Sequence, residues 1–344
     1  MLEVFQYPRR ALFIQIKQAG DCLLCTPAAR AFKKAYPTCE LHFLVSERYK
    51  GILEGNKHID RIIEFEEGSL LKAVKTALTL RGNGYDIVVD FLSSPTSSKL
   101  AYATGAKIRI GFGGRGRSWA YNKIPVDLNP DDYSAKHKLE LLKLINVKDD
   151  GLRLDFMVPY EEMEKVSSDL RQFKSGLLAV VPVSRRPYKR YPPEHFAGVL
   201  NRMTEEFNIT PMLLCGPGET PFLTDIKMKL KGDFILREVN SFQQFGAYIA
   251  HSKMFFGNDN GPKHIAVALG VPTFVVIGHI NPSNWTPPDD LKHTFIRQRL
   301  DCQLDCNPKK CINFRCIEDI PPAEVYVRLK EHYRQAVSNE VSPD

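Results

Sequence analysis

Short apolar runs alternate with helix-like stretches twice along this chain, and this alternation limits the fold more than any other feature. In the first half, apolar runs at 11–17, 41–46, 61–65, 85–91 and 107–112 are separated by helical patterns at 21–36, 48–54, 69–81 and 97–104. In the second half, runs at 177–183, 209–216, 253–259 and 272–278 are separated by helical patterns at 195–207, 220–231, 242–251 and 262–269. Strands that alternate with helices form parallel sheets covered on both faces. The sequence predicts two α/β, Rossmann-like domains.

The 344 residues suit two domains of ordinary size. We expect an N-terminal domain at 1–158, a charged connecting helix at 159–175, a C-terminal domain at 176–320, and a final helix and tail at 321–344. Ligands of open parallel sheets bind beyond the carboxyl ends of the strands. The two halves are therefore expected to bind ligands in a cleft between them.

The charge balance favours an anionic partner. The net charge is +7 and the pI about 8.9, which suits a phosphate, a nucleotide or an anionic glycolipid. It is too weak to argue for nucleic acid, and no zinc-finger, RRM or basic-zipper pattern is found. No segment reaches the roughly 18 to 20 apolar residues of a membrane span, and the first residues lack a signal-peptide pattern. We expect a cytoplasmic protein, with a peripheral membrane contact left open.

The strongest local pattern is the segment GNDNGPKHIAVALGVPT at 257–273, where a strand runs through a turn into a helix. Asp259 or Asn260 can cap that helix, and Pro262 suits its first turn. The helix N-terminus then offers N–H groups and a positive dipole end to an anion. Gly261 allows close approach of a diphosphate, and His264 can add a hydrogen bond. An ordinary capped helix explains the local pattern equally well.

Asp21 follows the first strand in the segment KQAGDCLLCTPAAR. At the carboxyl edge of a sheet, its carboxylate could take a proton from a sugar hydroxyl as a general base. Capping of the following helix is the simpler alternative.

Two loops are rich in cations. The segment SRRPYKRYPPEHF at 184–196 offers Lys189 and three arginines to phosphates, although such runs are usually solvated. In the first half, Ser93, Arg115 and Arg117 lie in loops that suit an anionic acceptor; a flexible exposed loop is the alternative.

Four cysteines gather near the C-terminus, at Cys302, Cys306, Cys311 and Cys316. They are compatible with a structural zinc site or with free thiols, and their spacing is wider than in most zinc ribbons. Cys22 and Cys25 have a redox-like spacing without a thioredoxin pattern, and we interpret both as small packed residues.

The ordered set of these motifs resembles the heptosyltransferases of glycosyltransferase family 9. The matching elements are Gly20-Asp21 followed by Thr26-Pro27, then Tyr36-Pro37, then Lys189-Arg190-Tyr191-Pro192, and then Asp259-Asn260-Gly261-Pro262-Lys263-His264 followed by Leu269-Gly270-Val271-Pro272. The resemblance covers nearly the whole chain. Two departures are Asn260, where the family usually has Thr or Ser, and Lys17, where it usually has Arg.

This resemblance implies a GT-B fold and an inverting, metal-independent transfer of heptose from ADP-heptose to a lipopolysaccharide inner-core acceptor. It implies that Asp21 is the base and that Ser184 and Lys189 contact the diphosphate. It places Asp259, Asn260, Gly261 and His264 at the donor and Glu219 at the ribose, with Lys17 on the acceptor side. No cofactor is expected. The alternatives are a GT-B transferase or epimerase for another nucleotide sugar, and a catalytically silent nucleotide-sugar-binding protein. A dinucleotide oxidoreductase is disfavoured, because no G-x-G-x-x-G follows the first strand.

Overall fold

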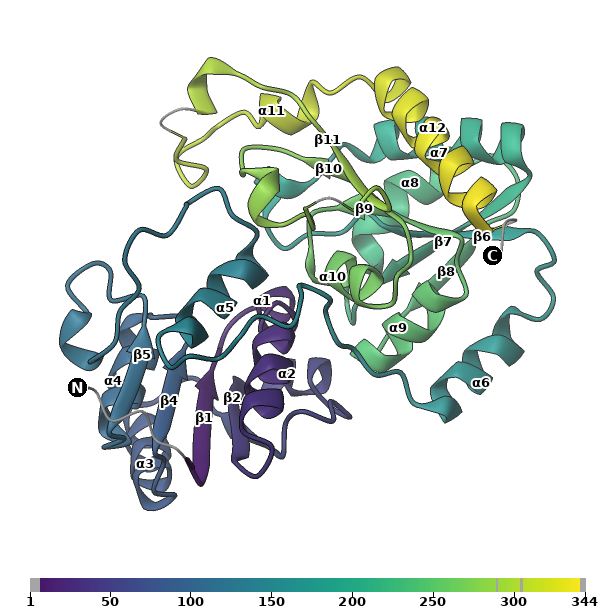
Figure 1. Ribbon diagram of the computed structural model, residues 1–344. Coiled ribbons are helices and arrows are strands. Elements are labelled where there is room, and N and C mark those ends of the chain that lie inside the picture. Colours follow the sequence, from purple (N-terminus) through teal and green to yellow (C-terminus); the bar gives the residue numbers. More distant parts are fainter. Residues whose placement is uncertain (1–6, 289, 304–305, 341–344) are drawn as a thin grey trace. The chain divides into compact units, whose positions relative to one another are not determined.

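The computed structural model describes residues 7–288, 290–303 and 306–340 (Figure 1). The chain divides into two compact units between Met157 and Val158. Each unit holds one sheet in which every strand pairs in parallel with its neighbours. The predicted pair of parallel α/β domains is thereby confirmed.

The first unit contains a five-stranded sheet in the order β3-β2-β1-β4-β5. Its strands are β1 (Arg10–Ile14), β2 (Glu40–Ser46), β3 (Arg61–Phe65), β4 (Ile87–Asp90) and β5 (Ile108–Gly111). Its helices are α1 (Ala19–Leu23), α2 (Thr26–Ala35), α3 (Leu70–Gly82), α4 (Pro95–Ala103) and α5 (Ser134–Lys143), with 3-10 turns η1 (Glu47–Ile52) and η2 (Ser118–Ala120).

Alternation along β1 distributes the core of this unit over both faces of the sheet. Leu12 and Ile14 lie in one apolar cluster with Leu80 of α3 and Leu100 of α4. Phe13 points to the opposite face, where its ring meets Phe32 of α2 at a centroid distance of 5.3 Å. Because β-strand side chains alternate, α3 and α4 cover one face and α2 covers the other.

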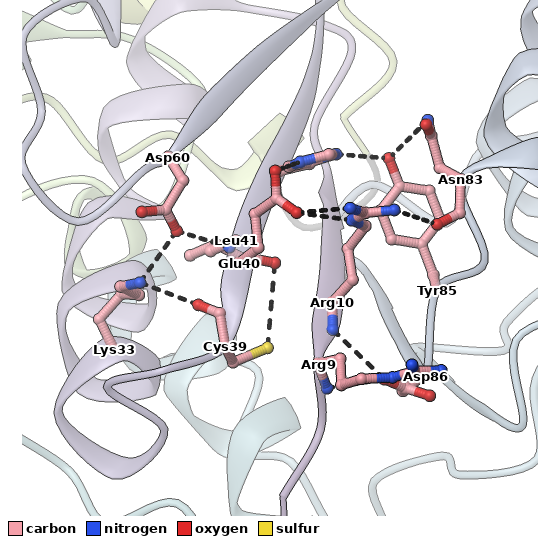
Figure 2. Close-up of polar contacts among 11 residues, drawn as sticks. Arg9, Arg10, Lys33, Cys39, Glu40, Leu41, Asp60, Asn83, Tyr85 and Asp86 are labelled. Atoms are coloured by element: carbon pink, nitrogen blue, oxygen red, sulfur yellow. Dashed lines mark hydrogen bonds and ion pairs between the residues drawn. The ribbon is translucent and has the colours of Figure 1, made fainter.

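Charged side chains close the amino end of this sheet (Figure 2). Arg10 of β1 donates from Nε to Glu40 of β2 at 2.7 Å and from its guanidinium to the carbonyl of Asn83 at 2.6 Å. The carboxylate of Asp86 accepts from the backbone N–H groups of Arg9 and Arg10. These bonds tie three neighbouring strands together at the edge remote from the strand carboxyl ends.

The second unit contains a six-stranded sheet in the order β11-β10-β9-β6-β7-β8. Its strands are β6 (Gly176–Val181), β7 (Ile209–Cys215), β8 (Ile235–Glu238), β9 (Met254–Asn258), β10 (Thr273–Ile277) and β11 (His293–Arg297). Its helices are α6 (Tyr160–Leu170), α7 (Pro193–Phe207), α8 (Thr224–Lys229), α9 (Phe242–Ala250), α10 (Gly261–Ala268), α11 (Arg315–Glu318) and α12 (Pro322–Glu340). The 3-10 turns are η3 (Pro187–Lys189), η4 (Thr220–Leu223), η5 (Pro282–Asn284) and η6 (Asp301–Gln303).

Two strands of this sheet were not predicted from the sequence. Both, β8 and β11, are the edge strands, where one side is open to solvent and polar residues such as Arg237 and Glu238 are tolerated. Their mixed composition hides the apolar run that marks a buried strand.

The single helix predicted at 21–36 is divided into α1 and α2. Pro27 has no N–H to donate to the carbonyl of Leu23, and the hydroxyl of Thr26 donates to that carbonyl instead, at 2.7 Å. The predicted helix at 220–231 likewise begins as the 3-10 turn η4.

The helix predicted as a connector, α6, lies in the second unit. Its Asp169 pairs with Arg237 of β8 at 2.8 Å and accepts from the hydroxyl of Tyr248 of α9 at 2.9 Å. The last helix, α12, packs on α7 (Figure 1), where Glu206 pairs with Lys330 at 2.7 Å. Over the residues that the structure describes, no helix is both long and apolar enough to span a bilayer.

Candidate functional site

Strand order reverses once in each sheet, and the polar residues singled out by the sequence follow the strands at these two points. In the second unit, β6 and β9 are neighbours in the sheet although two strands, β7 and β8, lie between them in the chain. Ser184 follows β6, and Asp259 and Asn260 follow β9. In the first unit the corresponding pair is β1 and β4. Such switch points leave a crevice beyond the strand carboxyl ends, where ligands of open α/β sheets bind.

Two asparagines join the ends of β6 and β9. The buried amide of Asn258 donates to the carbonyl of Pro182 at 2.6 Å and accepts from the N–H of Tyr191 at 3.1 Å. The amide of Asn260 donates to the carbonyl of Val183 at 3.1 Å. Its oxygen accepts from the N–H of Lys263 at 3.3 Å, so Asn260 caps α10.

The side chain of Asn260 is hydrogen-bonded within the protein. The family resemblance places Asn260 at the donor. In the structure the amide donates to two protein carbonyls, those of Val181 and Val183. Pro262 also brings no N–H to the first turn. An anion at this helix N-terminus would therefore be attracted chiefly by the helix dipole and by nearby cations.

The carboxylate of Asp259 lies between two lysines. Its Oδ2 is 2.7 Å from Nζ of Lys189, in η3, and its Oδ1 is 2.9 Å from Nζ of Lys263, in α10. Burial by itself would raise the pKa of Asp259, but Lys263 and then Lys189 outweigh it and hold that pKa well below its ordinary value. Asp259 is therefore ionised at neutral pH.

The two lysines differ in access to solvent. Lys263 is almost completely buried, at 1% exposed, and its Nζ also donates to the carbonyl of Trp285 at 2.7 Å. Burial lowers the pKa of Lys263, and Asp259 opposes that change. The side chain of Lys189 keeps 26% of its surface. Lys189 is thus the cation of this group that a ligand can reach, whereas Lys263 holds the group together.

Tyr191 anchors the loop that carries Lys189. Its ring is 1% exposed, its hydroxyl donates to the carbonyl of Ile320 at 2.9 Å, and its N–H is held by Asn258. Ser184 lies on the same loop: its hydroxyl accepts from the N–H of Arg186 at 3.2 Å, and its carbonyl accepts from Arg190 at 2.6 Å. In the sequence motif Lys-Arg-Tyr-Pro, the buried aromatic residue Tyr191 therefore fixes the position of the cation Lys189.

Of the other predicted donor residues, two lie in α10 and one follows β7. His264 is buried, with its ring 6.2 Å from that of Trp285, and Gly261 is the first residue of α10. Glu219 follows β7, the strand next to β6, and its carboxylate accepts from the N–H of Gly216 at 2.9 Å. This hydrogen bond thus holds the Glu219 side chain within its own turn.

In the first unit, Lys17 and Asp21 follow β1. Lys17 is exposed, and Asp21 is half-buried in the first turn of α1. The N-cap of α1 is Gln18, not Asp21, so the capping alternative for Asp21 does not hold. Gln18 has φ of 68°, and Ser93, which follows β4, has φ of 46°. Backbone strain of this kind occurs on both sides of the first switch point and is frequent at functional sites.

The predicted acceptor residues after β4 and β5 have unequal access. Ser93 is 5% exposed; its hydroxyl accepts from the N–H of Phe112 at 2.9 Å and donates to the carbonyl of Asp90 at 3.3 Å. Arg117 donates from Nε to the carbonyl of Ser93 at 2.6 Å. Ser93 and Arg117 therefore brace the loop after β5, while Arg115 is exposed.

Sequence reasoning missed the structural roles of three residues at the second switch point. Lys263 was noted only as a member of the family motif, although its i, i+4 spacing from Asp259 was a usable signal. The carbonyl of Trp285 and the ring of His279 come from loops after β10 that have no motif. Burial lowers the pKa of His279, and Lys189 lowers it further.

The cysteines divide into two groups. Cys22 and Cys25 are buried thiols that donate to the carbonyls of Gln15 and Asp21, as expected of packed residues. The C-terminal group runs from exposed Cys302 to buried Cys316. Within the described ranges, no three His, Cys, Asp or Glu residues are grouped to hold a metal ion.

Two doubly wound parallel units, each with polar residues at its strand carboxyl ends, are the architecture of the GT-B fold. The chain belongs to glycosyltransferase family 9 (heptosyltransferase), whose sequence profile matches residues 73–313. It is therefore a glycosyltransferase of the heptosyltransferase type, as the motifs predicted.

Known relatives agree with this assignment. Lipopolysaccharide heptosyltransferase 3 of Escherichia coli (strain K12) is 24% identical over 295 residues, which cover 78% of this chain and 82% of the relative. Among solved structures, a family 9 glycosyl transferase from Veillonella parvula superposes with a TM-score of 0.82 at 18% identity, covering 95% of this chain and 97% of that one. The ADP-heptose lps heptosyltransferase II of E. coli superposes with a TM-score of 0.76 at 19% identity, covering 95% and 99%. These structural likenesses support the fold.

Proposed function

We propose that this enzyme transfers a heptose from ADP-heptose to a lipopolysaccharide inner-core acceptor, with inversion at the anomeric carbon. The donor and acceptor classes are those named for the relatives and those implied by the ordered family motifs. The observation that carries the donor half is the ion group at the start of α10. There, partly exposed Lys189 is held on Asp259 beside the positive end of a helix.

In this proposal the reaction is a single displacement. The acceptor hydroxyl oxygen forms a bond to the anomeric carbon, the bond from that carbon to the ADP oxygen breaks, and Asp21 takes the hydroxyl proton. Lys189 and the N-terminus of α10 stabilise the negative charge that gathers on the leaving diphosphate. Because these protein groups supply positive charge, we expect the reaction to need no divalent cation.

Asp21 is proposed as the base because of its position. It follows β1 at the first switch point, it is half-buried in the first turn of α1, and it is not engaged as the N-cap. A carboxylate beyond the strand carboxyl ends can accept a proton from a hydroxyl bound there. Lys17 and Arg115, both exposed, are proposed to attract an anionic acceptor.

The test measures ADP release from ADP-heptose, with and without a Kdo-bearing lipid A acceptor. We expect release that depends on acceptor and persists in EDTA. Asp21→Asn should lower kcat by about 10² or more with ADP binding unchanged. Asp225→Asn is the matched control, since Asp225 is an exposed first-turn aspartate of α8, and it should retain activity.

Other outcomes separate the alternatives. Donor binding without acceptor-dependent release would indicate a silent binding protein or a different acceptor. If another nucleotide sugar binds in preference to ADP-heptose in a competition experiment, that sugar is the donor in place of ADP-heptose. Loss of ADP binding in Asp21→Asn would make Asp21 a structural residue rather than the base.

A further inference from the structure

One outer surface of the first unit exposes apolar side chains along α3. Leu71, Val74 and Leu78 are 82%, 48% and 67% exposed. Their i, i+3, i+7 spacing places them on one face of the helix. Among the side chains of α3 that the structure describes, only Leu80 is buried. An unpartnered apolar strip of this kind is uncommon on a soluble domain and marks an interaction site.

Two exposed aromatic side chains lie on the neighbouring elements α4 and η2. Helix α3 packs beside α4 (Figure 1), and Tyr102 of α4 is 54% exposed. Its ring lies 5.3 Å from that of Trp119 in η2, which is 53% exposed. We call the five residues Leu71, Val74, Leu78, Tyr102 and Trp119 the α3–α4 surface. Tyr and Trp with one apolar and one polar edge are typical of membrane interfaces.

The charge of this region is strongly one-sided. Residues 68–126 contain nine Lys and Arg and two acidic residues, Asp86 and Asp90; one of these cations, Lys72, pairs at 2.8 Å with Glu66, just outside this range. Neither carboxylate offsets the positive surface: Asp86 binds backbone N–H groups at the amino end of the sheet (Figure 2), and Asp90 is fully buried. Lys75 and Arg81 are exposed on the same helical face as the apolar strip. The excess of seven positive charges equals the net charge of the whole chain.

We propose that the α3–α4 surface binds an anionic lipid bilayer. The apolar side chains would enter the headgroup layer, the two aromatic rings would lie at its boundary, and the surrounding cations would pair with lipid phosphates. A second copy of the chain is a poorer occupant, because it would bring an equal positive charge against this surface. The proposal depends on neither the donor nor the acceptor of the reaction.

Vesicle co-sedimentation of the full chain tests this surface. Phosphatidylcholine vesicles with about one third phosphatidylglycerol should bind the protein at least tenfold more tightly than neutral vesicles, and salt should weaken that binding. The double variants Leu71→Glu/Leu78→Glu and Lys75→Glu/Arg81→Glu should each lose at least about tenfold in affinity. Circular dichroism checks that these surface variants fold.

The chain supplies matched controls in α8 of the second unit. Met228 is 71% exposed there, and Lys227 and Lys229 are exposed beside it. Met228→Glu and Lys227→Glu/Lys229→Glu should bind anionic vesicles nearly as the wild type does. Equal losses in the α8 and α3–α4 variants would mean that net charge alone directs binding and would overturn the proposal.

Trp119 provides a direct readout. The chain has two tryptophans, so in a Trp285→Phe background the emission reports the α3–α4 surface alone. Anionic vesicles should shift that emission to the blue, and neutral vesicles should not. Absence of vesicle binding by the wild type would overturn the proposal. So would a dimer in size-exclusion chromatography that Leu71→Glu/Leu78→Glu dissociates while vesicle binding is unchanged.

Discussion

Oδ1 of Asp259 and Nζ of Lys263 lie 2.9 Å apart, and both side chains are almost completely buried. Because Lys263 also donates to the carbonyl of Trp285 and Asp259 also binds Lys189, this one pair connects three segments of the second unit. A buried ion pair gains little over an apolar pair, but removing one partner leaves a buried charge unpaired. The first prediction follows from that asymmetry.

Lys263→Met is expected to destabilise the second unit by about 3 kcal/mol, since Asp259 would keep only Lys189 as a counter-charge. Urea unfolding followed by Trp285 fluorescence, in a Trp119→Phe background, measures this. Lys165→Met is the control: Lys165 forms an exposed pair with Glu162 at 2.7 Å, and its loss should change stability by less than about 0.5 kcal/mol. Equal shifts in both variants would contradict the structural role of Lys263.

Lys189→Ala is expected to weaken binding of ADP by about tenfold or more, because it removes the cation of the ion group that is open to solvent. Lys189→Arg should retain part of the affinity by keeping the charge. Isothermal titration with ADP measures both. Arg185→Ala, on the same loop and exposed, should bind nearly as the wild type. If the two alanine variants lose affinity equally, the loop attracts ADP through diffuse charge.

The second unit should lose stability as the pH falls from about 6.5 to about 4. Burial lowers the pKa of His293 to about 4, and Asp290 opposes that effect. The unfolded histidine then binds its proton at a pH where the folded one does not, so falling pH favours unfolding, by up to about 3 kcal/mol. His293→Gln should flatten the dependence of the urea midpoint on pH over this range. An unchanged slope in the variant would assign the effect to other groups.

Gly257→Ala should destabilise the second unit by about 3 kcal/mol, because an added Cβ would lie 2.5 Å from the carbonyl oxygen of Val181 on β6. Gly198→Ala is the matched control in the interior of α7, where a Cβ meets nothing within 4 Å. It should stabilise by about 0.5 to 1 kcal/mol through its helix propensity. Thermal unfolding of the two variants tests the close approach of β9 to β6. Shifts of the same sign in both variants would contradict that close approach.

Ser93→Ala should destabilise the first unit by about 1 to 3 kcal/mol, because the N–H of Phe112 loses its acceptor. Trp119 fluorescence in the Trp285→Phe background follows the unfolding. Thr79→Ala, at an exposed position of α3, should leave stability nearly unchanged. A Ser93→Ala variant of normal stability with a raised KM for the acceptor would instead support the ligand contact predicted from the sequence.

Features that depend on neighbouring residues in the chain could be predicted from the sequence, and features that depend on distant residues could not. Strands with a clear apolar run were predicted, the edge strands β3 and β5 included. The edge strands β8 and β11 were missed because polar residues, which an edge position tolerates, interrupt their apolar runs. The start of α10 was also predictable, since Asn260 and Pro262 are local signals for a cap and a first turn. The break between α1 and α2 had its signal in Pro27, but its effect depends on how Thr26 replaces the missing bond.

Local spacing and composition were enough to specify two parallel α/β units, the helix that begins at residue 261 and the family motifs. They were not enough to specify which side chains interact with one another. Lys189 and Asp259 are 70 residues apart in the chain, and they meet because β6 and β9 became neighbours when the sheet formed. The amide of Asn260 bonds to the carbonyls of Val181 and Val183 for the same reason. Strand order brings distant segments to one edge of a sheet, and contacts across that edge exist only once the whole sheet has folded.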